Sequence, residues 1–280
     1  MTSADSAPEA MQWVASLLQR LAGHALPPEK DYLLQSRLLP VARRFGMPDV
    51  ASLLRALQNG GNRPLEQAVA EAMATHETSF FRDPNVFQCL RTHVLPKLFQ
   101  DNGHRVRLWS AAASTGQEAI SLAILCLELL GERAEGRVEI LATDFSSAVL
   151  ARMRAGIYTA FEVQRGLPAA MLVRYFEKCG RDFQICPAVA RLIRCEQHNL
   201  LDSAARFGRF DVILLRNVLI YMDSASRRRV LEHVHAALKP QGWLVLGVTE
   251  SVGSSADLFQ PDPLGHVFYR PLVRRGKSGD

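Results

Sequence analysis

The residues of this sequence best placed for chemistry are two acids that each stand near the end of an apolar run. Glu118 follows a small-residue loop with one glycine, Gly116, and that loop follows the apolar run that begins at Leu108. Asp144 comes directly after a second apolar run, residues 138–143. In α/β folds such a loop receives a nucleotide-type cofactor, and an acid that ends the next strand binds the ribose hydroxyls. The spacing therefore predicts a cofactor site across two neighbouring strand ends.

The loop lacks the glycines that a dinucleotide requires. A GxGxxG run lets the backbone approach a pyrophosphate, whereas Gly116 is the only glycine here. An adenosine cofactor without phosphates fits better than NAD or FAD, and S-adenosylmethionine is the best candidate. The alternative for Asp144 is that it only caps the helix that begins near Ser146.

Two further polar groups follow apolar runs and are expected at the same edge of the sheet. Asn199 with Leu200 forms the first group, although Asn199 could simply close a turn. Arg216 and Asn217 come directly after the run FDVILL and lead to Tyr221. Because ligands of open α/β sheets bind at the carboxyl ends of strands, these residues are candidates for the same site.

The elements that must position these residues alternate between strand and helix patterns. This order is typical of a parallel, doubly wound sheet with crossover helices. A short last strand, residues 266–270, is expected to be antiparallel. One stretch, residues 176–196, breaks the alternation and predicts a small β-hairpin insert. The expected strands are 106–109, 138–143, 210–215 and 243–248, and the expected helices are 116–130, 146–154 and 224–238.

The beginning of the chain has helical periodicity instead. Apolar residues recur at helical intervals between Met11 and Leu57, and glycines punctuate the pattern. Residues 64–74 and 84–99 predict two more helices, the second with Pro84 in its first turn. The expected domains are a helical one over residues 1–75 and an α/β one over residues 76–280, with a β subdomain at about 176–196.

Composition excludes several classes of protein. The 280 residues are 48% hydrophobic, with no run of 18 apolar residues and no export signal, so we expect a cytoplasmic protein that is not inserted in a membrane. The five cysteines have no zinc-ligand spacing, which predicts reduced thiols and no metal. The net charge of +5 weakly favours an acidic partner.

Five segments, in order, resemble the chemotaxis receptor methyltransferases of the CheR family, and the resemblance spans essentially the whole chain. It implies a class I S-adenosylmethionine-methyltransferase sheet with a small all-α N-terminal domain. The segments are Thr78 to Asp83, Trp109 to Glu118, Ala142 to Asp144, Asn199 to Leu201 and Arg216 to Tyr221.

The resemblance implies methyl transfer from S-adenosylmethionine to glutamate side chains on the cytoplasmic helices of a chemoreceptor. The products would be glutamate methyl esters and S-adenosylhomocysteine. Arg82 and Tyr221 match the catalytic pair at the methyl-transfer centre. The matching cofactor-binding positions are His76, Thr78, Arg82, Glu118, Asp144, Asn199, Leu200, Arg216 and Asn217. Two departures stand out: His76 replaces a common Asn, and Gln117 to Ile120 replaces the common Glu-Glu-Pro-Tyr.

The residue types suit this chemistry independently. A glutamate with an ordinary pKa near 4.3 is already an anionic nucleophile at neutral pH and needs no general base. The enzyme must instead align the reacting groups. The Arg82 guanidinium can hold one carboxylate oxygen by a charge-assisted hydrogen bond, and the Tyr221 hydroxyl can orient the attacking group.

The helical domain offers a candidate docking surface for a receptor. Lys30, Arg37 and Arg44 are seven residues apart and would share one helix face, unless Pro40 ends that helix first. Such a stripe is either a solvated face or a surface for an acidic helical bundle. The hairpin within 179–195 lacks a glycine-rich loop, which favours a member that needs no receptor tether peptide. We expect a monomer.

Two other functions remain open at this level. One is an S-adenosylmethionine-dependent methyltransferase that acts on RNA or a small molecule. Two observations count against it: the segment from Arg216 to Tyr221 lacks the Asn-Pro-Pro-Tyr type of motif of amino-methylating enzymes, and no basic patch carries interleaved aromatics to stack on nucleic-acid bases. The other is a non-catalytic adaptor that senses the cofactor, which would not need both Arg82 and Tyr221.

Overall fold

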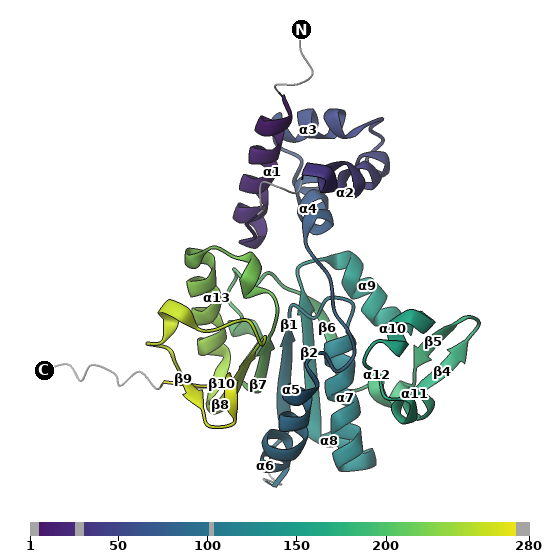
Figure 1. Ribbon diagram of the computed structural model, residues 1–280, viewed down its shortest axis with the longest axis vertical. Helices are drawn as coiled ribbons and strands as arrows, with labels where there is room; N and C mark the ends of the chain where they lie inside the picture. The colour runs from purple at the N-terminus through teal and green to yellow at the C-terminus, as the bar shows by residue number, and fades with distance from the viewer. Residues whose placement is uncertain (1–5, 26–30, 101–103, 273–280) are drawn as a thin grey trace, which may run out of the picture. The chain divides into compact units, whose positions relative to one another are not determined.

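The computed structural model describes residues 6–25, 31–100 and 104–272, and the chain divides into two compact units. A helical unit comprises the chain up to Thr75 together with Tyr221–Arg227. A sheet unit comprises His76–Ile220 and the chain from Arg228 onward (Figure 1).

The sheet unit is built on a seven-stranded sheet in the order β6-β2-β1-β7-β8-β10-β9. The first five strands in this order pair in parallel, and β10 pairs antiparallel with both β8 and β9. This confirms the prediction of a mostly parallel, doubly wound sheet. The strands are β1 (Val106–Ala111), β2 (Val138–Asp144), β6 (Ile193–Gln197), β7 (Phe210–Leu215), β8 (Leu238–Leu246), β9 (Phe259–Asp262) and β10 (Gly265–Pro271).

The order of the strands reverses at β1. Strands β2 and β6 lie on one side of it and β7 and β8 on the other, so the loops after β1 and β7 diverge from a topological switch point. All six residues of β7 are buried, as expected for a strand of a parallel sheet that is covered on both faces. The main covering helices are α7 (Gln117–Leu130), α9 (Ser147–Ala155) and α13 (Ser224–Ala237).

The expected helix over residues 84–99 is present, but its middle turn is wider than an α-helix. It consists of α5 (Pro84–Cys89), the π-helical η2 (Leu90–Val94) and α6 (Leu95–Gln100). The Leu95 N–H donates to the Leu90 carbonyl, five residues back. Pro96 has no N–H to continue an α-helical ladder, and a π turn accommodates this loss.

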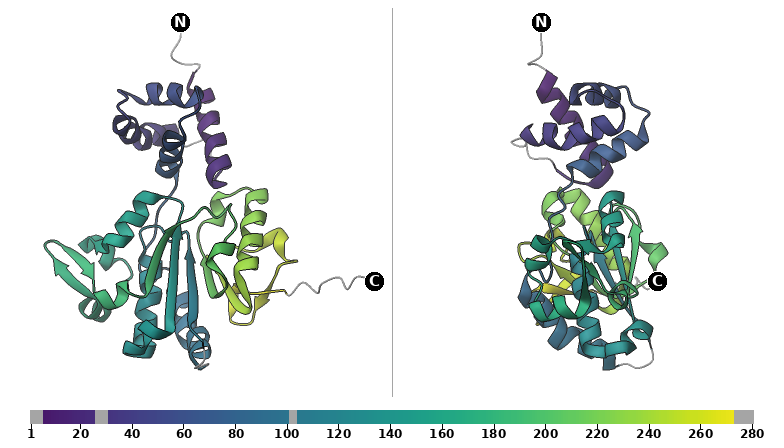
Figure 2. Two further views of the ribbon diagram at one scale, coloured as in Figure 1. Left: turned by 180° about the vertical axis from the view of Figure 1, so that it is seen from behind. Right: turned by 90° about the vertical axis from the view of Figure 1, so that its right-hand side faces the viewer.

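The insert is a three-stranded sheet in the order β3-β5-β4, at the β6 edge of the sheet unit (Figure 2). A hairpin is present, but its strands are β4 (Phe176–Cys179) and β5 (Asp182–Ile185) and not the two apolar runs of residues 183–186 and 190–195 that the sequence suggested. Strand β3 (Ile157–Tyr158) pairs with β5. The helices α10 (Ala160–Gln164) and α11 (Ala169–Tyr175) complete this region, whereas α12 (Pro187–Ala190) contacts α7.

The assignment of the whole stretch 176–196 to the insert is wrong. Pro187 begins α12, and the following run forms β6, which pairs in parallel with β2 at the edge of the main sheet. A short apolar run predicts a strand but not which sheet it joins, because that choice depends on partners far away in the sequence.

Aromatic rings attach the insert to the segment before α5. The Phe80 ring is 5.2 Å from the Tyr158 ring and 5.6 Å from the Phe176 ring, both edge-on. Gly166 has φ 91°, and a Cβ on it would lie 2.0 Å from the Phe80 carbonyl oxygen. The segment that leads to the predicted Arg82 is therefore held by core packing, and Phe80 and Phe81 are both buried.

In the described part of residues 1–75, the helical unit consists of α1 (Ser6–Ala22), α2 (Asp31–Arg44), α3 (Val50–Gln58) and α4 (Arg63–Met73). Asp49 and Asn62 cap α3 and α4, since their side chains accept hydrogen bonds from Ser52 N and Leu65 N. Helix α2 continues through Pro40 to Arg44. After α1, His24 forms an isolated antiparallel bridge with Met222.

Arg37, a member of the expected docking stripe, is occupied within the helical unit. Its Nη1 donates to the carbonyl oxygens of Met73 at 2.6 Å and Ala74 at 3.2 Å, at the end of α4. The last carbonyls of a helix have no partner within the helix, so this guanidinium satisfies two of them. Arg44 is exposed, and Lys30 lies outside the described residues.

Within the described residues, none of the helices is both long and apolar enough to cross a bilayer.

The role of Arg37 predicts a local effect of its removal. In Arg37→Ala, two carbonyls at the end of α4 lose a charged donor, which should cost about 1–3 kcal/mol. Hydrogen exchange of α2 and α4 amides, followed by mass spectrometry, should therefore be roughly tenfold faster or more. Arg44→Ala, on the same helix but exposed, is the control and should leave exchange unchanged. Equal rates in both variants would contradict this role.

Candidate active site

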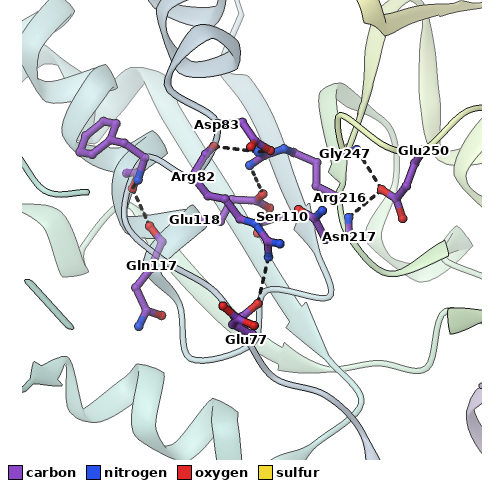
Figure 3. A network of polar contacts seen from close by, with 12 residues as sticks. Glu77, Arg82, Asp83, Ser110, Gln117, Glu118, Arg216, Asn217, Gly247 and Glu250 are labelled. Atoms are coloured by element: carbon purple, nitrogen blue, oxygen red, sulfur yellow. Dashed lines mark hydrogen bonds and ion pairs between the residues drawn. The ribbon is translucent and has the colours of Figure 1, made fainter. Parts of the chain in front are cut away.

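Hydrogen bonds and ion pairs connect four segments of the sheet unit near the switch point: the segment before α5, the loop after β1, the end of β2 and the loop after β7. Figure 3 shows the contacts of Arg216 with Glu118 and with the segment before α5. The sequence-predicted residues Arg82, Glu118, Asp144 and Arg216 come from these segments or from the first turn of the following helix.

Arg216 is the centre of a buried ion network. Its Nη1 donates to Glu118 Oε2 at 2.8 Å, and its Nη2 donates to Asp83 Oδ2 and to the Arg82 carbonyl oxygen, both at 2.7 Å. The Arg216 side chain is 1% exposed. Ser110 at the end of β1 donates its hydroxyl to Glu118 Oε1 at 2.7 Å. The network joins three of the sequence-predicted residues.

Asp144 ties the loop after β1 to the turn after β2. Its Oδ2 accepts from Ser114 N at 2.8 Å and its Oδ1 from Ser146 N at 2.9 Å. The N-cap of α9 is Ser146, so Asp144 is not the capping residue that the alternative reading supposed. The backbone N–H of His198 donates to the Asp144 carbonyl at 3.0 Å, which connects the end of β6 to the same turn.

Backbone strain is concentrated in these loops. In the described chain, five non-glycine residues have positive φ, a conformation that side chains rarely adopt. Strain of this kind persists only where surrounding contacts impose it and is common at functional sites. The five are Phe81 (47°), Asp83 (59°), Ala112 (63°), Ser114 (53°) and Asn217 (57°).

His76 and Thr78 line a cavity of about 530 Å³ together with Thr115, Gln117 and residues of α9 and α10. Beside them, Arg82 Nη1 donates to the Glu77 carbonyl oxygen at 3.1 Å, and the Glu77 carboxylate pairs with Arg165. His76, Thr78 and the first turn of α7 thus line one cavity. Arg82 contacts Glu77, which belongs to the same segment of chain.

The Asn199 side chain closes a turn, which is the structural alternative that its position in the sequence left open. Its Oδ1 accepts from Leu201 N at 3.0 Å and closes a turn, while the following Leu200 is buried. The backbone of this turn still lies directly after His198, which is bonded to Asp144.

Tyr221 groups with the helical unit, whereas Arg82 belongs to the sheet unit. The Tyr221 carbonyl accepts from Ala25 N at 2.7 Å, and its ring centre is 6.0 Å from that of His24. The expected catalytic pair is therefore divided between the units.

Glu250 is a site residue that sequence reasoning missed. Its carboxylate accepts hydrogen bonds from four backbone N–H groups, three of them in the loop after β7. Figure 3 shows the hydrogen bonds from Asn217 and Gly247. The only signal in the sequence was its position shortly after β8, whose end neighbours that of β7.

The residues fit S-adenosylmethionine. Arg216 Nε is buried, and no group of the described chain accepts its hydrogen bond, so it can serve a ligand anion. The trio of Asp83, Glu118 and Arg216 has two carboxylates and one guanidinium, a negative balance that suits a sulfonium. The described residues contain no cluster of three His, Cys, Asp or Glu side chains that could hold a metal ion.

A parallel sheet with a cofactor loop after its first strand, an acid at the end of the second and no dinucleotide motif defines a class I S-adenosylmethionine-dependent methyltransferase. Residues 76–267 match the family described as CheR methyltransferase, SAM binding domain, and residues 9–73 match CheR methyltransferase, all-alpha domain. The chain belongs to the CheR methyltransferase family. The resemblance to this family, stated from the sequence motifs, is confirmed.

Relatives match along most of their length. Chemotaxis protein methyltransferase 1 of Pseudomonas aeruginosa is 38% identical over 251 residues, which cover 87% of this chain and 90% of that protein. Chemotaxis protein methyltransferase 1 of Vibrio cholerae is 37% identical and covers 87% of this chain and 89% of that protein. The protein is thus a methyltransferase with an S-adenosylmethionine-binding domain.

His198 predicts a pH dependence of stability. Burial, with a smaller contribution from nearby Arg206, lowers the pKa of His198 from its ordinary value to about 4. The unfolded chain therefore binds more protons between pH 6.5 and 4, and stability present above pH 6.5 is lost as the pH falls through this range.

In His198→Phe this contribution is absent. The loss of unfolding free energy between pH 7 and 4.5, measured by urea titration with tryptophan fluorescence, should be smaller than in the wild type by on the order of 2 kcal/mol. Parallel pH profiles of the two proteins would contradict the assignment.

Proposed function

We propose that the protein transfers the methyl group of S-adenosylmethionine to the side-chain carboxylate of glutamate residues on the cytoplasmic helices of chemoreceptors. The observation that carries this proposal is the match of both domains to one family whose relatives are named chemotaxis protein methyltransferases. The products are glutamate methyl esters and S-adenosylhomocysteine.

The carboxylates of the site already have hydrogen-bond or ion-pair partners within the chain, which supports a substrate that is ionised before it binds. Glu118, Asp83, Asp144 and Glu250 all accept hydrogen bonds or ion pairs from the chain. These contacts give each of the four carboxylates a structural role within the chain, which supports a reaction that needs no general base. A glutamate carboxylate needs no such base, whereas most acceptors in RNA or small molecules do.

S-adenosylmethionine supplies a methyl group on a positively charged sulfur. For the chain, we assign cofactor binding to His76, Thr78, Arg82, Glu118, Asp144, Asn199, Leu200, Arg216 and Asn217. Arg82 holds the substrate carboxylate, and Tyr221 orients it. Holding the carboxylate in line with the methyl group can lower the activation free energy by on the order of 7–11 kcal/mol.

The remaining parts of the proposal concern the partner. The chain acts in the cytoplasm as a monomer, on the receptor's helical bundle rather than on nucleic acid. The hairpin supports independence from a receptor tether, because Cys179 pairs directly with Asp182 and leaves only Gly180 and Arg181 in the turn. Lys30 and Arg44 of the basic stripe dock the receptor; Arg37, which is bound to the end of α4, contributes less.

The first test measures ester formation. Methyl-labelled cofactor and chemoreceptor membranes should give label that mild alkali releases as volatile methanol, and Arg82→Ala should lower kcat/KM about 10²-fold by misplacing the acceptor. Arg209→Ala makes the same change at an exposed position directly before β7, at the end of that strand remote from Arg216, and should have normal activity. Alkali-stable label would indicate N-methylation, and no label despite cofactor binding would indicate an adaptor.

The second test addresses docking. Arg44→Glu should raise KM for receptor roughly fivefold at low salt and less at high salt, because an exposed charge at an interface is screened. Cofactor affinity should not change. Arg133→Glu makes the same substitution at an exposed position of the sheet unit and serves as the control. Identical KM values in the two variants would remove the stripe from the proposal.

A further inference from the structure

The carboxylate of Glu250 gathers four backbone donors. Its Oε2 accepts from Asn217 N at 2.6 Å and Gly247 N at 2.9 Å, and its Oε1 accepts from Val218 N at 3.0 Å and Ile220 N at 3.2 Å. The residue is 7% exposed. It lies in the loop that follows β8, so one side chain joins the ends of two neighbouring strands.

The chemistry of these four contacts specifies a carboxylate. Every partner is an N–H donor, and an ionised carboxylate offers two oxygens that only accept. Hydrogen bonds to a charged acceptor are about twice as strong as neutral ones. A glutamine would turn an NH2 group toward one pair of donors and leave them without an acceptor.

The loop that Glu250 holds is the one that presents Arg216 and Asn217. Asn217 has φ 57°, a strained conformation that must be imposed by contacts. Directly before it, the Arg216 side chain enters the ion network with Glu118 and Asp83. Glu250 holds the backbone N–H groups of Asn217, Val218 and Ile220 in place. It thereby fixes the position of the backbone from which the Arg216 and Asn217 side chains extend.

Gly247 is required for the same arrangement. A Cβ on Gly247 would lie 2.6 Å from Glu250 Oε2 and 3.0 Å from Asn217 N. Its φ is not in the left-handed region, so alanine is tolerated by the local backbone but would displace the carboxylate. The Gly247 carbonyl also accepts the Glu250 N–H at 3.0 Å in a turn, but that turn does not require a glycine conformation, so the missing Cβ serves the carboxylate contact.

We infer that Glu250 is a positioning residue for cofactor binding, which acts through the loop of residues 216–220. The inference rests on the proposed placement of Arg216 and Asn217 at the cofactor. A purely structural role is the competing explanation, because any buried carboxylate with several partners contributes to stability.

Asp211 provides the matched control for that explanation. It is a buried acid near the beginning of β7, the same strand that ends before Arg216, and it accepts from Arg107 N at 2.9 Å and from Lys239 at 2.8 Å. Asp211→Asn removes one buried negative charge, as Glu250→Gln does, but at the opposite end of the strand.

The experiment measures dissociation constants for S-adenosylmethionine and S-adenosylhomocysteine by calorimetry, and melting temperatures, on the full chain. Glu250→Gln and Gly247→Ala should both weaken binding of the two ligands tenfold or more, and hydrogen exchange of residues 216–220 should accelerate. Asp211→Asn should lower the melting temperature and leave both dissociation constants within twofold of the wild type.

Two results would overturn the inference. One is unchanged ligand affinity in Gly247→Ala, which keeps every charge in place. The other is a loss of affinity in Asp211→Asn as large as that in Glu250→Gln, which would mark a general effect of instability. Neither depends on receptor substrate: a wild type that binds cofactor but forms no receptor ester would contradict the proposed function alone.

Discussion

The geometry of the site depends on the burial of one guanidinium between two carboxylates. Arg216 comes from the end of β7, Glu118 from the first turn of α7 and Asp83 from the segment before α5, and the three meet at distances of 2.7–2.8 Å. Removing one partner of a buried ion pair costs about 3–5 kcal/mol, because the remaining charge is left without compensation. The three side chains therefore depend on one another, and the network aligns three stretches of chain that are far apart in the sequence.

This constraint explains where the backbone is strained. Asp83 lies in the ion network, Asn217 directly follows Arg216, and Ser114 donates its N–H to Asp144. At these three positions a polar contact holds the peptide or its neighbour in place, and such contacts supply the free energy that the unfavourable conformations require. A site assembled in this way exists before a ligand arrives, which reduces the ordering cost of binding.

The parallel sheet and the acids at its strand ends could be predicted from the sequence, because strand and helix periodicities and the position of Glu118 and Asp144 are local signals. The edge strand β6 could not be assigned to its sheet, since its pairing with β2 is a long-range choice. Arg37 was placed on a surface stripe because spacing shows which face a residue shares but not the carbonyls that lie beside it. Glu250 was missed for the same reason: its partners are backbone groups, which every sequence contains.

The short segment Tyr221–Arg227 has a consequence for how the protein can be divided. The chain leaves the sheet unit at Ile220, contributes seven residues to the helical unit and returns at Arg228, so the two units are joined by three crossings of the backbone instead of one. Met222 is 4% exposed, and Tyr221 shares a backbone hydrogen bond with Ala25. Cutting the chain after Thr75 would strip this turn of its packing partners. The helical unit is thus made of two separate stretches of the chain. A fusion or domain exchange that transfers this unit must therefore include residues 221–227 as well as residues 1–75.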